Sequence, residues 1–245
     1  MKQFLTALCA LFPSKLAHFF LKLLGHDISW KSKIGFSILY VKKICLTNNA
    51  IIGHFNLFKI ESIFLKKDSS IGSFNLFKGP FHILLESNTN IGKLNRFQRG
   101  SFPISYDKSE LKIGQGTRIT TGNYFDLTNS ITFGEDSQVA GMESQFWTHG
   151  YMHADKGIDR IRIDGEIKIG NNVYIGSRCL FNPGVTVFDA INIGGNSVIS
   201  KDLKTSGMYV NQTLRYIETD INKTRQKLKK VETSGLIEEV YTKNN

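Results

Sequence analysis

Two histidines of this 245-residue chain, His149 and His153, lie close together beside a segment rich in charged residues, Tyr151 to Lys168. An imidazole changes its charge near neutral pH, so it can take a proton from a hydroxyl group and give it to a leaving group. A charged excursion on a regular scaffold is a common place for function. These residue types suit proton transfer, and the surrounding elements must position them.

The elements around these residues repeat with a fixed spacing. Ile-Gly pairs recur, with separations that cluster at 18 to 22 residues, at positions 34–35, 52–53, 71–72, 91–92, 113–114, 169–170, 175–176 and 193–194. Near the end of the repeat, apolar residues stand six apart: Ile169, Ile175, Phe181, Val187, Ile193 and Ile199. Three short walls and three corners then form a triangular coil of 18 residues, in which residue i stacks on i+18. We therefore expect an all-β solenoid, a left-handed parallel β-helix whose short, bare-cornered strands escape the right-handed crossover rule.

The six-residue register continues upstream with slips of one or two residues. It predicts inward side chains at three groups of positions: Ile52, Phe58 and Phe64; Ile71, Phe77 and Ile83; Ile113, Ile119, Phe125 and Ile131. Gly and Asn that follow an inward residue are expected at corners that need a positive φ. The Pro- and Tyr-containing segment from Ser101 to Lys108 is predicted to be an excursion between two coils.

Composition, charge and cysteine content limit the class of protein. The chain has 31 Lys+Arg against 21 Asp+Glu, a net charge of +10, and 41% apolar residues. This composition excludes a collagen, a disordered chain and a polytopic membrane protein. The three cysteines, Cys9, Cys45 and Cys179, lack CxxC spacing, which favours a reducing, cytoplasmic location over a disulfide framework. The basic charge comes without a nucleic-acid reader motif, so we expect no nucleic-acid partner.

The two ends of the chain fall outside the repeat. In residues 1–27, apolar side chains recur every three or four positions, at Leu5, Leu8, Phe12, Leu16, Phe19 and Leu23. They predict one or two amphipathic helices over residues 2–24. These helices can cap the core, dock on the anionic inner face of the cytoplasmic membrane, or do both. No small-residue cleavage site follows, so we expect this segment to be retained. Residues 28–206 are expected to form the β-helix, with an insertion at 151–168, and residues 207–245 a helical C-terminal extension.

A series of motifs in the second half of the chain adds a family resemblance. They are Phe133-Gly-Glu-Asp, Thr148-His149, the charged loop, Ile169-Gly-Asn-Asn-Val-Tyr-Ile-Gly-Ser, Asn182-Pro-Gly-Val-Thr and Ser197-Val-Ile-Ser-Lys-Asp. With these motifs, residues 133–215 resemble the hexapeptide-repeat acyltransferases, specifically the galactoside/maltose acetyltransferase-like group that includes many polysaccharide O-acetyltransferases. The N-terminal coils resemble the fold of this family and no particular specificity.

The resemblance implies transfer of an acetyl group from acetyl-CoA to a sugar hydroxyl of a surface polysaccharide or its precursor, with no metal. It places the general base at His149, with His153 as a competitor because the register runs about one residue short of the family pattern. It implies coenzyme contacts at Tyr174, Ser177, Gly195, Ser200, Lys201 and Arg215. Asn123 and Asp126, one coil before His149, are expected to bind the hydroxyls of the sugar acceptor. Family members place the site between the subunits of a trimer, so a homotrimer is expected.

Three other functions use the same scaffold. N-acetylation of an amino sugar nucleotide would need the same coenzyme and a different acceptor. A zinc-dependent carbonic anhydrase would need three histidines that converge on the metal, and no third histidine joins His149 and His153 at a convincing coil position. A purely structural coil protein would bind no acetyl-CoA.

Overall fold

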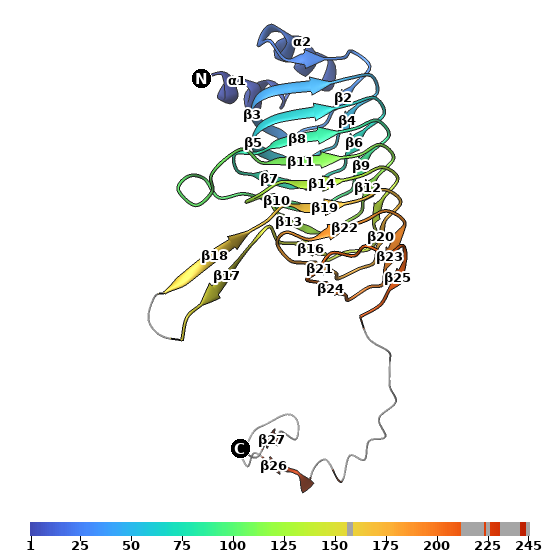
Figure 1. Cartoon of the computed structure of the whole chain (residues 1–245). Helices are drawn as coiled ribbons and strands as arrows, with labels where there is room; N and C mark the ends of the chain where they lie inside the picture. Colours follow the sequence, from blue (N-terminus) through green and yellow to red (C-terminus); the bar gives the residue numbers. More distant parts are fainter. Residues whose placement is uncertain (156–158, 212–222, 224–225, 231–240, 244–245) are drawn as a thin grey trace. The chain divides into compact units, whose positions relative to one another are not determined.

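Residues 1–155, 159–211, 223, 226–230 and 241–243 are described by the computed structural model of the chain. The chain divides into two compact units, Met1–Asn211 and Gln212–Asn245. The first unit begins with two short helices, and a parallel β-solenoid of about nine turns follows them (Figure 1). The predicted fold class, a left-handed parallel β-helix with N-terminal helices, is confirmed.

Each turn of the solenoid passes through three walls, which we number in the order in which the chain visits them. Wall 1 is the nine-stranded sheet made of β2 (Lys33–Ile34), β4 (Ile51–Ile52), β6 (Ser70–Ile71), β9 (Asn90–Ile91), β12 (Arg118–Ile119), β15 (Gln138–Val139), β20 (Tyr174–Ile175), β23 (Ile191–Ile193) and β25 (Gly207–Tyr209). Wall 2 contains β7 (Leu76–Lys78), β10 (Arg96–Gln98), β13 (Tyr124–Asp126), β16 (Gln145–Phe146), β21 (Leu180–Phe181) and β24 (Val198–Ile199).

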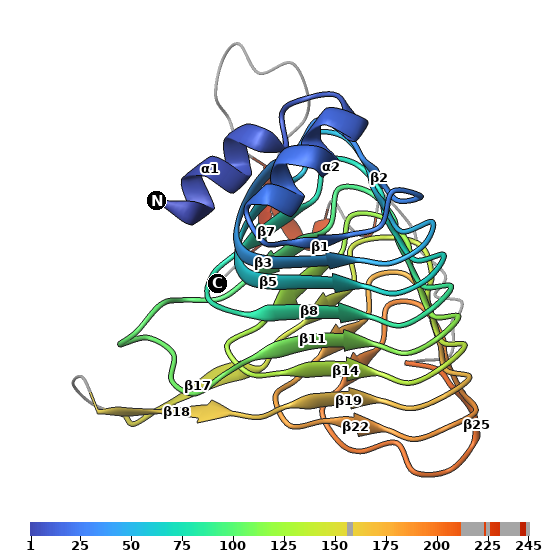
Figure 2. The same ribbon diagram turned by 90° about the horizontal axis from the view of Figure 1, so that it is seen from above.

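Wall 3 is adjacent to wall 2, and in the early coils continuous strands connect the two walls. Its strands are β1 (Asp27–Ile28), β8 (His82–Leu85), β11 (Glu110–Ile113), β14 (Ile131–Phe133), β19 (Ile167–Ile169) and β22 (Thr186–Val187). Two longer strands, β3 (Ile38–Leu46) and β5 (Leu57–Leu65), run through both walls, so walls 2 and 3 form one 14-stranded sheet. The stacked strands of wall 3 are seen in Figure 2.

The last coils have the predicted 18-residue repeat. Ile175 pairs with Ile193, Phe181 with Ile199, and Ile169 with Val187. All six inward residues of this register have 4% or less of their surface exposed. Upstream, the coil length varies: Lys33 pairs with Ile51 after 18 residues, Ile51 with Ser70 after 19, and Ser70 with Asn90 after 20. This variation accounts for the slips in the sequence pattern.

A column of phenylalanines fills the interior along wall 2. Phe58, Phe77, Phe97, Phe125, Phe146 and Phe181 stack with ring centroids 4.4 to 4.7 Å apart. Each is fully buried, which confirms the predicted inward positions of Phe58, Phe77, Phe125 and Phe181. The prediction for Phe64 is wrong: it is 39% exposed, and Ile63 is buried in its place. Ser62 and Ile63 are both buried in β5, so the alternation of inward and outward side chains shifts by one residue where this strand turns the corner.

The glycines that follow inward isoleucines allow the backbones of neighbouring coils to approach closely, and they are not needed for a positive φ. A Cβ atom on Gly53 would lie 2.5 Å from the carbonyl oxygen of Gly72 in the next coil, and one on Gly72 would lie 2.5 Å from that of Gly92. The positive φ angles fall later in the corner, at Asn172 (φ 53°) and Asn196 (φ 63°) among others. The sequence-based expectation was therefore right for asparagine, and for these glycines the physical reason is different.

Two excursions leave the solenoid at the corner between walls 2 and 3. The first is the segment from Ser101 to Lys108, which lengthens the offset between β10 and β13 to 28 residues (Arg96 pairs with Tyr124). The second is an antiparallel arm formed by β17 (His149–His153) and β18 (Arg160–Asp164). The chain returns to wall 3 after the arm, where Ile167 pairs with Ile131 of the preceding coil. Both excursions project on the same side of the solenoid (Figures 1 and 2).

Two helices precede the first coil: α1 (Lys2–Cys9) and α2 (Ser14–Leu23), which are separated near Pro13 as predicted. The Ser14 hydroxyl accepts a hydrogen bond from the Ile34 amide (3.0 Å), so α2 packs on the start of the solenoid. The second unit contains an antiparallel pair of short strands, β26 (Leu228–Lys230) and β27 (Tyr241–Lys243). Most of the predicted C-terminal helical extension lies outside the described residues.

Candidate active site

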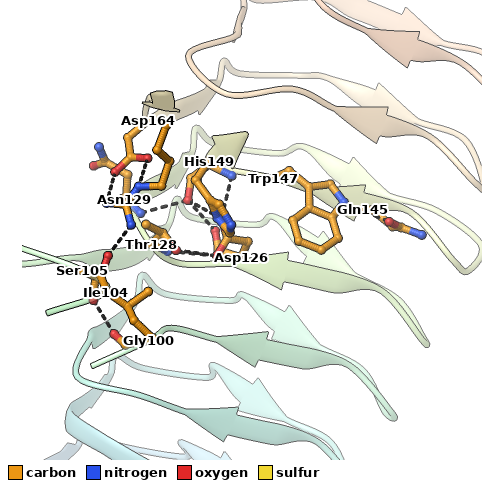
Figure 3. Close-up of polar contacts among 12 residues, drawn as sticks. Gly100, Ile104, Ser105, Asp126, Thr128, Asn129, Gln145, Trp147, His149 and Asp164 are labelled. Carbon is orange, nitrogen blue, oxygen red and sulfur yellow. Dashed lines mark hydrogen bonds and ion pairs between the residues drawn. The ribbon is translucent and has the colours of Figure 1, made fainter. Parts of the chain in front are cut away.

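His149 and Asp126 form a dyad at the corner from which the arm emerges. Asp126 ends β13 and His149 begins β17, one coil later, because Phe125 pairs with Phe146. The Nδ1 atom of His149 lies 2.7 Å from Oδ2 of Asp126 (Figure 3). Stacking of consecutive coils therefore places a carboxylate beside an imidazole that is 23 residues away in the sequence.

Four donors from the protein fix the carboxylate of Asp126. Oδ1 accepts hydrogen bonds from the amide (3.2 Å) and hydroxyl (2.8 Å) of Thr128. Oδ2 accepts from the amide (2.9 Å) of Thr148, and the Thr148 hydroxyl lies 2.8 Å from the same oxygen. Asp126 is only 3% exposed. Its side chain is thus oriented before any ligand binds, which is the arrangement that positions a catalytic imidazole.

The contact with Asp126 determines the state of the His149 ring. A carboxylate accepts hydrogen bonds, so the contact assigns the proton of the neutral imidazole to Nδ1. The other nitrogen, Nε2, is then an acceptor, and it has no hydrogen bond within the described part of the chain. The side chain is 27% exposed. The arrangement leaves one basic nitrogen accessible from outside, as a general base requires.

Aromatic side chains surround the imidazole on both sides. The ring centroids of Trp147 and Tyr151 lie 6.1 and 6.0 Å from that of His149, both edge-on. Trp147 also contacts Tyr124, at 4.8 Å between centroids, and its indole Nε1 donates to Gln145 Oε1 at 2.9 Å. Burial, with a smaller contribution from the charge of Asp126, raises the pKa of Tyr124.

A hollow of about 430 Å³ lies next to the dyad on the outer surface of wall 2. Tyr124 and Trp147 line it together with Arg96, Glu143 and Gln145. Tyr124 and Asp126 are alternate residues of the same strand, so the hollow adjoins the dyad. Aromatic rings beside hydrogen-bonding side chains suit a ligand with both an apolar face and hydroxyl groups. Tyr124 and Trp147 were not predicted as site residues, since nothing in the repeat distinguishes outward aromatics near a ligand from others.

The base of the arm is fixed by Arg162. Its Nε and Nη2 atoms each lie 2.8 Å from a carboxylate oxygen of Asp164, which pairs with His149 across the two strands. Arg162 Nη1 also donates to the carbonyl oxygen of Ile104 in the first excursion. Hydrogen bonding to Asp164 raises the pKa of Arg162. The two excursions are thereby tied together beside the dyad.

A second arginine, Arg99, fixes the position of the first excursion through hydrogen bonds to its backbone. Its guanidinium donates to the carbonyl oxygens of Pro80 (2.7 Å), Tyr106 (2.5 Å) and Asp107 (2.9 Å). Arg99 is only 7% exposed, and burial lowers its pKa. These three hydrogen bonds give the excursion a defined position over the corner.

The competing histidine, His153, has a different environment. It lies at the outer end of β17, opposite Arg160, and is exposed. Four residues of extended strand separate it from His149, which is about 13 Å. Its ring contacts Tyr151, at 6.3 Å between centroids, and no carboxylate of the described residues bonds to it. The geometry favours His149 as the base.

The predicted coenzyme residues occupy two places. Ser200 and Lys201 follow β24 at the same corner as the dyad, two coils beyond Trp147 and Thr148, which is roughly 10 Å along the solenoid. Tyr174 lies in wall 1, and Ser177 and Gly195 lie at the corner between walls 1 and 2. In the described part of the chain, no contact joins these three residues to His149. Arg215 lies outside the described residues.

Both predicted acceptor residues need correction. Asn123 is 1% exposed, and its side chain belongs to an internal ladder: it donates to Asn95 Oδ1 (3.2 Å) and accepts from the Ser144 amide (3.0 Å). These bonds occupy it inside the protein, so it does not contact an acceptor. Asp126 is also buried, and its oxygens are committed to His149, Thr128 and Thr148. Its side chain contacts the ring of His149, whereas the sequence placed it at the sugar acceptor.

The described residues contain no group of three or more His, Cys, Asp or Glu side chains that could hold a metal ion.

Comparison with known proteins relates this chain to acetyltransferases. No family model matches it. The galactoside O-acetyltransferase of Escherichia coli (strain K12) is 54% identical over 79 residues, which are 30% of this chain and 36% of that protein. A Staphylococcus aureus (strain COL) protein named as an acetyltransferase, SACOL2570, is 29% identical over 128 residues, 49% of this chain and 63% of that protein. The chain thus spans less than two thirds of the length of these curated relatives.

Among solved structures, the polysialic acid O-acetyltransferase OatWY has 15% sequence identity and a TM-score of 0.48, over 82% of this chain and 92% of that one. A maltose O-acetyltransferase from Clostridium difficile 630 has 22% identity and a TM-score of 0.42, over 56% of this chain and 70% of that one. The chain is a parallel β-helix protein whose curated relatives are named as acetyltransferases.

Proposed function

We propose that this protein transfers an acetyl group from acetyl-CoA to a hydroxyl group of a sugar, in a surface polysaccharide or its precursor. One observation carries the proposal: His149 is bonded through Nδ1 to the buried carboxylate of Asp126 at 2.7 Å, while Nε2 remains open to a ligand. The names of the curated relatives support the same class of reaction.

In this proposal His149 acts twice. Nε2 takes the proton from the sugar hydroxyl as its oxygen bonds to the thioester carbonyl carbon. When the carbon–sulfur bond breaks, the imidazolium returns the proton to the departing thiolate, so the products are an acetylated sugar and free coenzyme A. The Asp126 carboxylate stabilises the imidazolium and keeps the ring in place. Attack converts the carbonyl oxygen into an oxyanion, whose collapse re-forms the carbonyl group as the carbon–sulfur bond breaks.

Two sets of residues are proposed to hold the substrates. Lys201 and Ser200, exposed at the same corner as His149, would meet the phosphate-rich part of acetyl-CoA. Tyr174, Ser177 and Gly195 lie at other positions of the coil, so we propose that they serve the site of a neighbouring subunit in a homotrimer. The hollow beside Tyr124 and Trp147 would receive the sugar.

A thiol-release assay with acetyl-CoA tests the proposal. The wild type should release coenzyme A only when a hydroxyl acceptor is present, and a panel of neutral sugars, acidic sugars and amino sugar nucleotides would identify the acceptor class. His149→Ala should lower kcat/KM by roughly 10²- to 10⁴-fold. His153→Ala is the matched control and should retain activity. An unchanged rate for His149→Ala would contradict the proposed chemistry.

A further inference from the structure

The two N-terminal helices expose their large apolar side chains. In and just after α1, five side chains have 38 to 60% of their surface exposed: Phe4, Leu5, Leu8, Leu11 and Phe12. In α2, Leu16, Phe19 and Leu23 are 43, 49 and 70% exposed. We call these eight residues the helical apolar face. The sequence left two uses of this stripe open, capping the core and docking on an anionic membrane, and the structure turns its large apolar side chains outward.

The helices pack on the solenoid through their other side. Buried residues there are small or polar: Thr6, Ala10, Ala17 and His18, with Leu21 as the one large apolar side chain. Thr6 contacts His26 (2.9 Å), and His18 lies 3.4 Å from Ser14 and Ser32. Hydrogen bonds and small side chains thus fix the orientation of the helices. The exposed face is a consequence of this specific packing.

The helical apolar face is continuous between the helices. The rings of Phe12 and Phe20 lie 5.5 Å apart, and those of Phe19 and Phe20 lie 5.4 Å apart. A contiguous surface of this kind is unusual on a monomeric soluble protein and marks a site of association.

The surrounding charge is positive. Residues 1–26 contain Lys2, Lys15 and Lys22 and neither Asp nor Glu. Trp30, 56% exposed, lies at the edge with the Lys22 ammonium 5.4 Å from its ring centre. Lysine and tryptophan at the border of an apolar helix face are typical of segments that lie in the interface of a bilayer.

We propose that the helical apolar face docks the protein on an anionic lipid bilayer, with α1 and α2 lying in the interface. Anionic headgroups would meet the three lysines while the leucines and phenylalanines enter the acyl boundary. Self-association through the same face would instead bring like charges together, because a two-fold interface places each patch against its own copy. In the described part of the chain, no helix is long and apolar enough to cross a bilayer.

Docking would place the dyad at a fixed distance from the lipid. Four coil steps separate β3, which α1 contacts, from β13, which carries Asp126. At about 4.8 Å per step, this is roughly 20 Å along the solenoid. The proposal itself does not depend on acetyl transfer, and its test uses binding alone.

Vesicle flotation with the purified full-length chain tests this proposal. The protein should float with vesicles of phosphatidylcholine and phosphatidylglycerol and bind much less to phosphatidylcholine alone. High salt should release it, because surface charge is then screened. Equal recovery with the two vesicle types, or no flotation with the anionic ones, would overturn the proposal.

Two variants and one control separate the contributions. Phe4→Ser/Phe19→Ser should weaken the partition coefficient by on the order of thirtyfold, and replacing Lys2, Lys15 and Lys22 by Gln should weaken it by roughly a hundredfold. The matched control, Phe55→Ser/Phe74→Ser, removes two phenylalanines that are 63 and 55% exposed on the solenoid and should bind like the wild type. Unchanged circular dichroism would establish that the variants fold.

Sedimentation of lipid-free protein tests whether the helical apolar face binds a second copy of the chain instead of a bilayer. The wild type and Phe4→Ser/Phe19→Ser should have the same assembly state without lipid. If the wild type formed a larger assembly that this variant lost, the face would serve self-association and the proposal would be wrong.

Discussion

Two histidines of this protein, His149 and His26, have opposite environments. His26 is 5% exposed and uses both ring nitrogens inside the protein: Nδ1 accepts from the Ile44 amide (3.2 Å) and Nε2 contacts the Thr6 hydroxyl (2.9 Å). His149 bonds through Nδ1 to a carboxylate and keeps Nε2 open. The partners of Nδ1 also differ in kind, a donor for His26 and an acceptor for His149, so the two neutral rings carry their protons on different nitrogens.

The difference separates a structural histidine from a catalytic candidate. At His26 burial, followed by the charges of Lys2 and Lys43, lowers the pKa from 6.5 to about 4. A ring that is neutral and fully bonded stabilises the N-terminal cap and has no site for a substrate proton. At His149 the accessible nitrogen is the one that the carboxylate contact leaves basic. Residue type alone is therefore a weak guide to function, and the partner of each nitrogen decides.

The largest effect is expected for Asp126→Asn. An amide can donate to Nδ1 of His149, which favours the proton on Nε2 and removes the basic nitrogen. We expect kcat to fall by on the order of 10²- to 10⁴-fold, with the KM for acetyl-CoA within about twofold because Asp126 is buried and contacts His149. Steady-state kinetics of thiol release measures both constants.

Thr128→Val is the matched control for that variant. It removes one donor to Oδ1 of Asp126 and leaves the contact with His149 intact, so kcat should change only a few-fold. If Thr128→Val and Asp126→Asn lost activity equally, the dyad would have no special role.

The next largest effect concerns stability at His26. Because its pKa is lower in the folded state, its contribution is complete above pH 6.5 and is lost as the pH falls toward about 4. The shift corresponds to about 3 kcal/mol of unfolding free energy. Chemical denaturation of the wild type and His26→Ala at pH 7 and pH 4.5 should give a steeper loss for the wild type. Parallel curves would assign the acid sensitivity to other groups.

The smallest effect is expected for Trp147→Ala, which removes one wall of the hollow beside the dyad. The acceptor KM should rise by about fivefold, since an aromatic contact of this kind contributes on the order of 1 kcal/mol, and kcat should change less. An acceptor KM equal to that of the wild type would place the sugar elsewhere.

Most of the fold could be predicted from the sequence because the repeat is local. Six-residue spacing from Ile169 to Ile199 determines which side chains point inward, and the strands pair as that spacing predicts. The exceptions depend on packing contacts that the six-residue pattern does not describe. Phe64 is exposed because β5 shifts its alternation, and the apolar stripe of α1 and α2 faces outward because small and polar residues make the contact with the solenoid.

The site was predicted less completely. His149 was identified through a family resemblance, and the repeat placed Asp126 one coil before it. The repeat does not encode the contact between the two side chains. Asn123 and Asp126 were grouped because they lie one coil before His149. Only the structure distinguishes the asparagine, which faces the internal ladder, from the aspartate, which lies outside the wall.

The central claim is that Asp126 holds His149 with its proton on Nδ1 and its basic Nε2 exposed. Nitrogen-15 NMR of the histidine side chains, at a pH where the rings are neutral, tests it directly. We predict that His149 has the Nδ1–H tautomer and His26 the Nε2–H tautomer, and that Asp126→Asn changes the signals of His149 alone. An Nε2–H tautomer for His149 in the wild type would contradict the account.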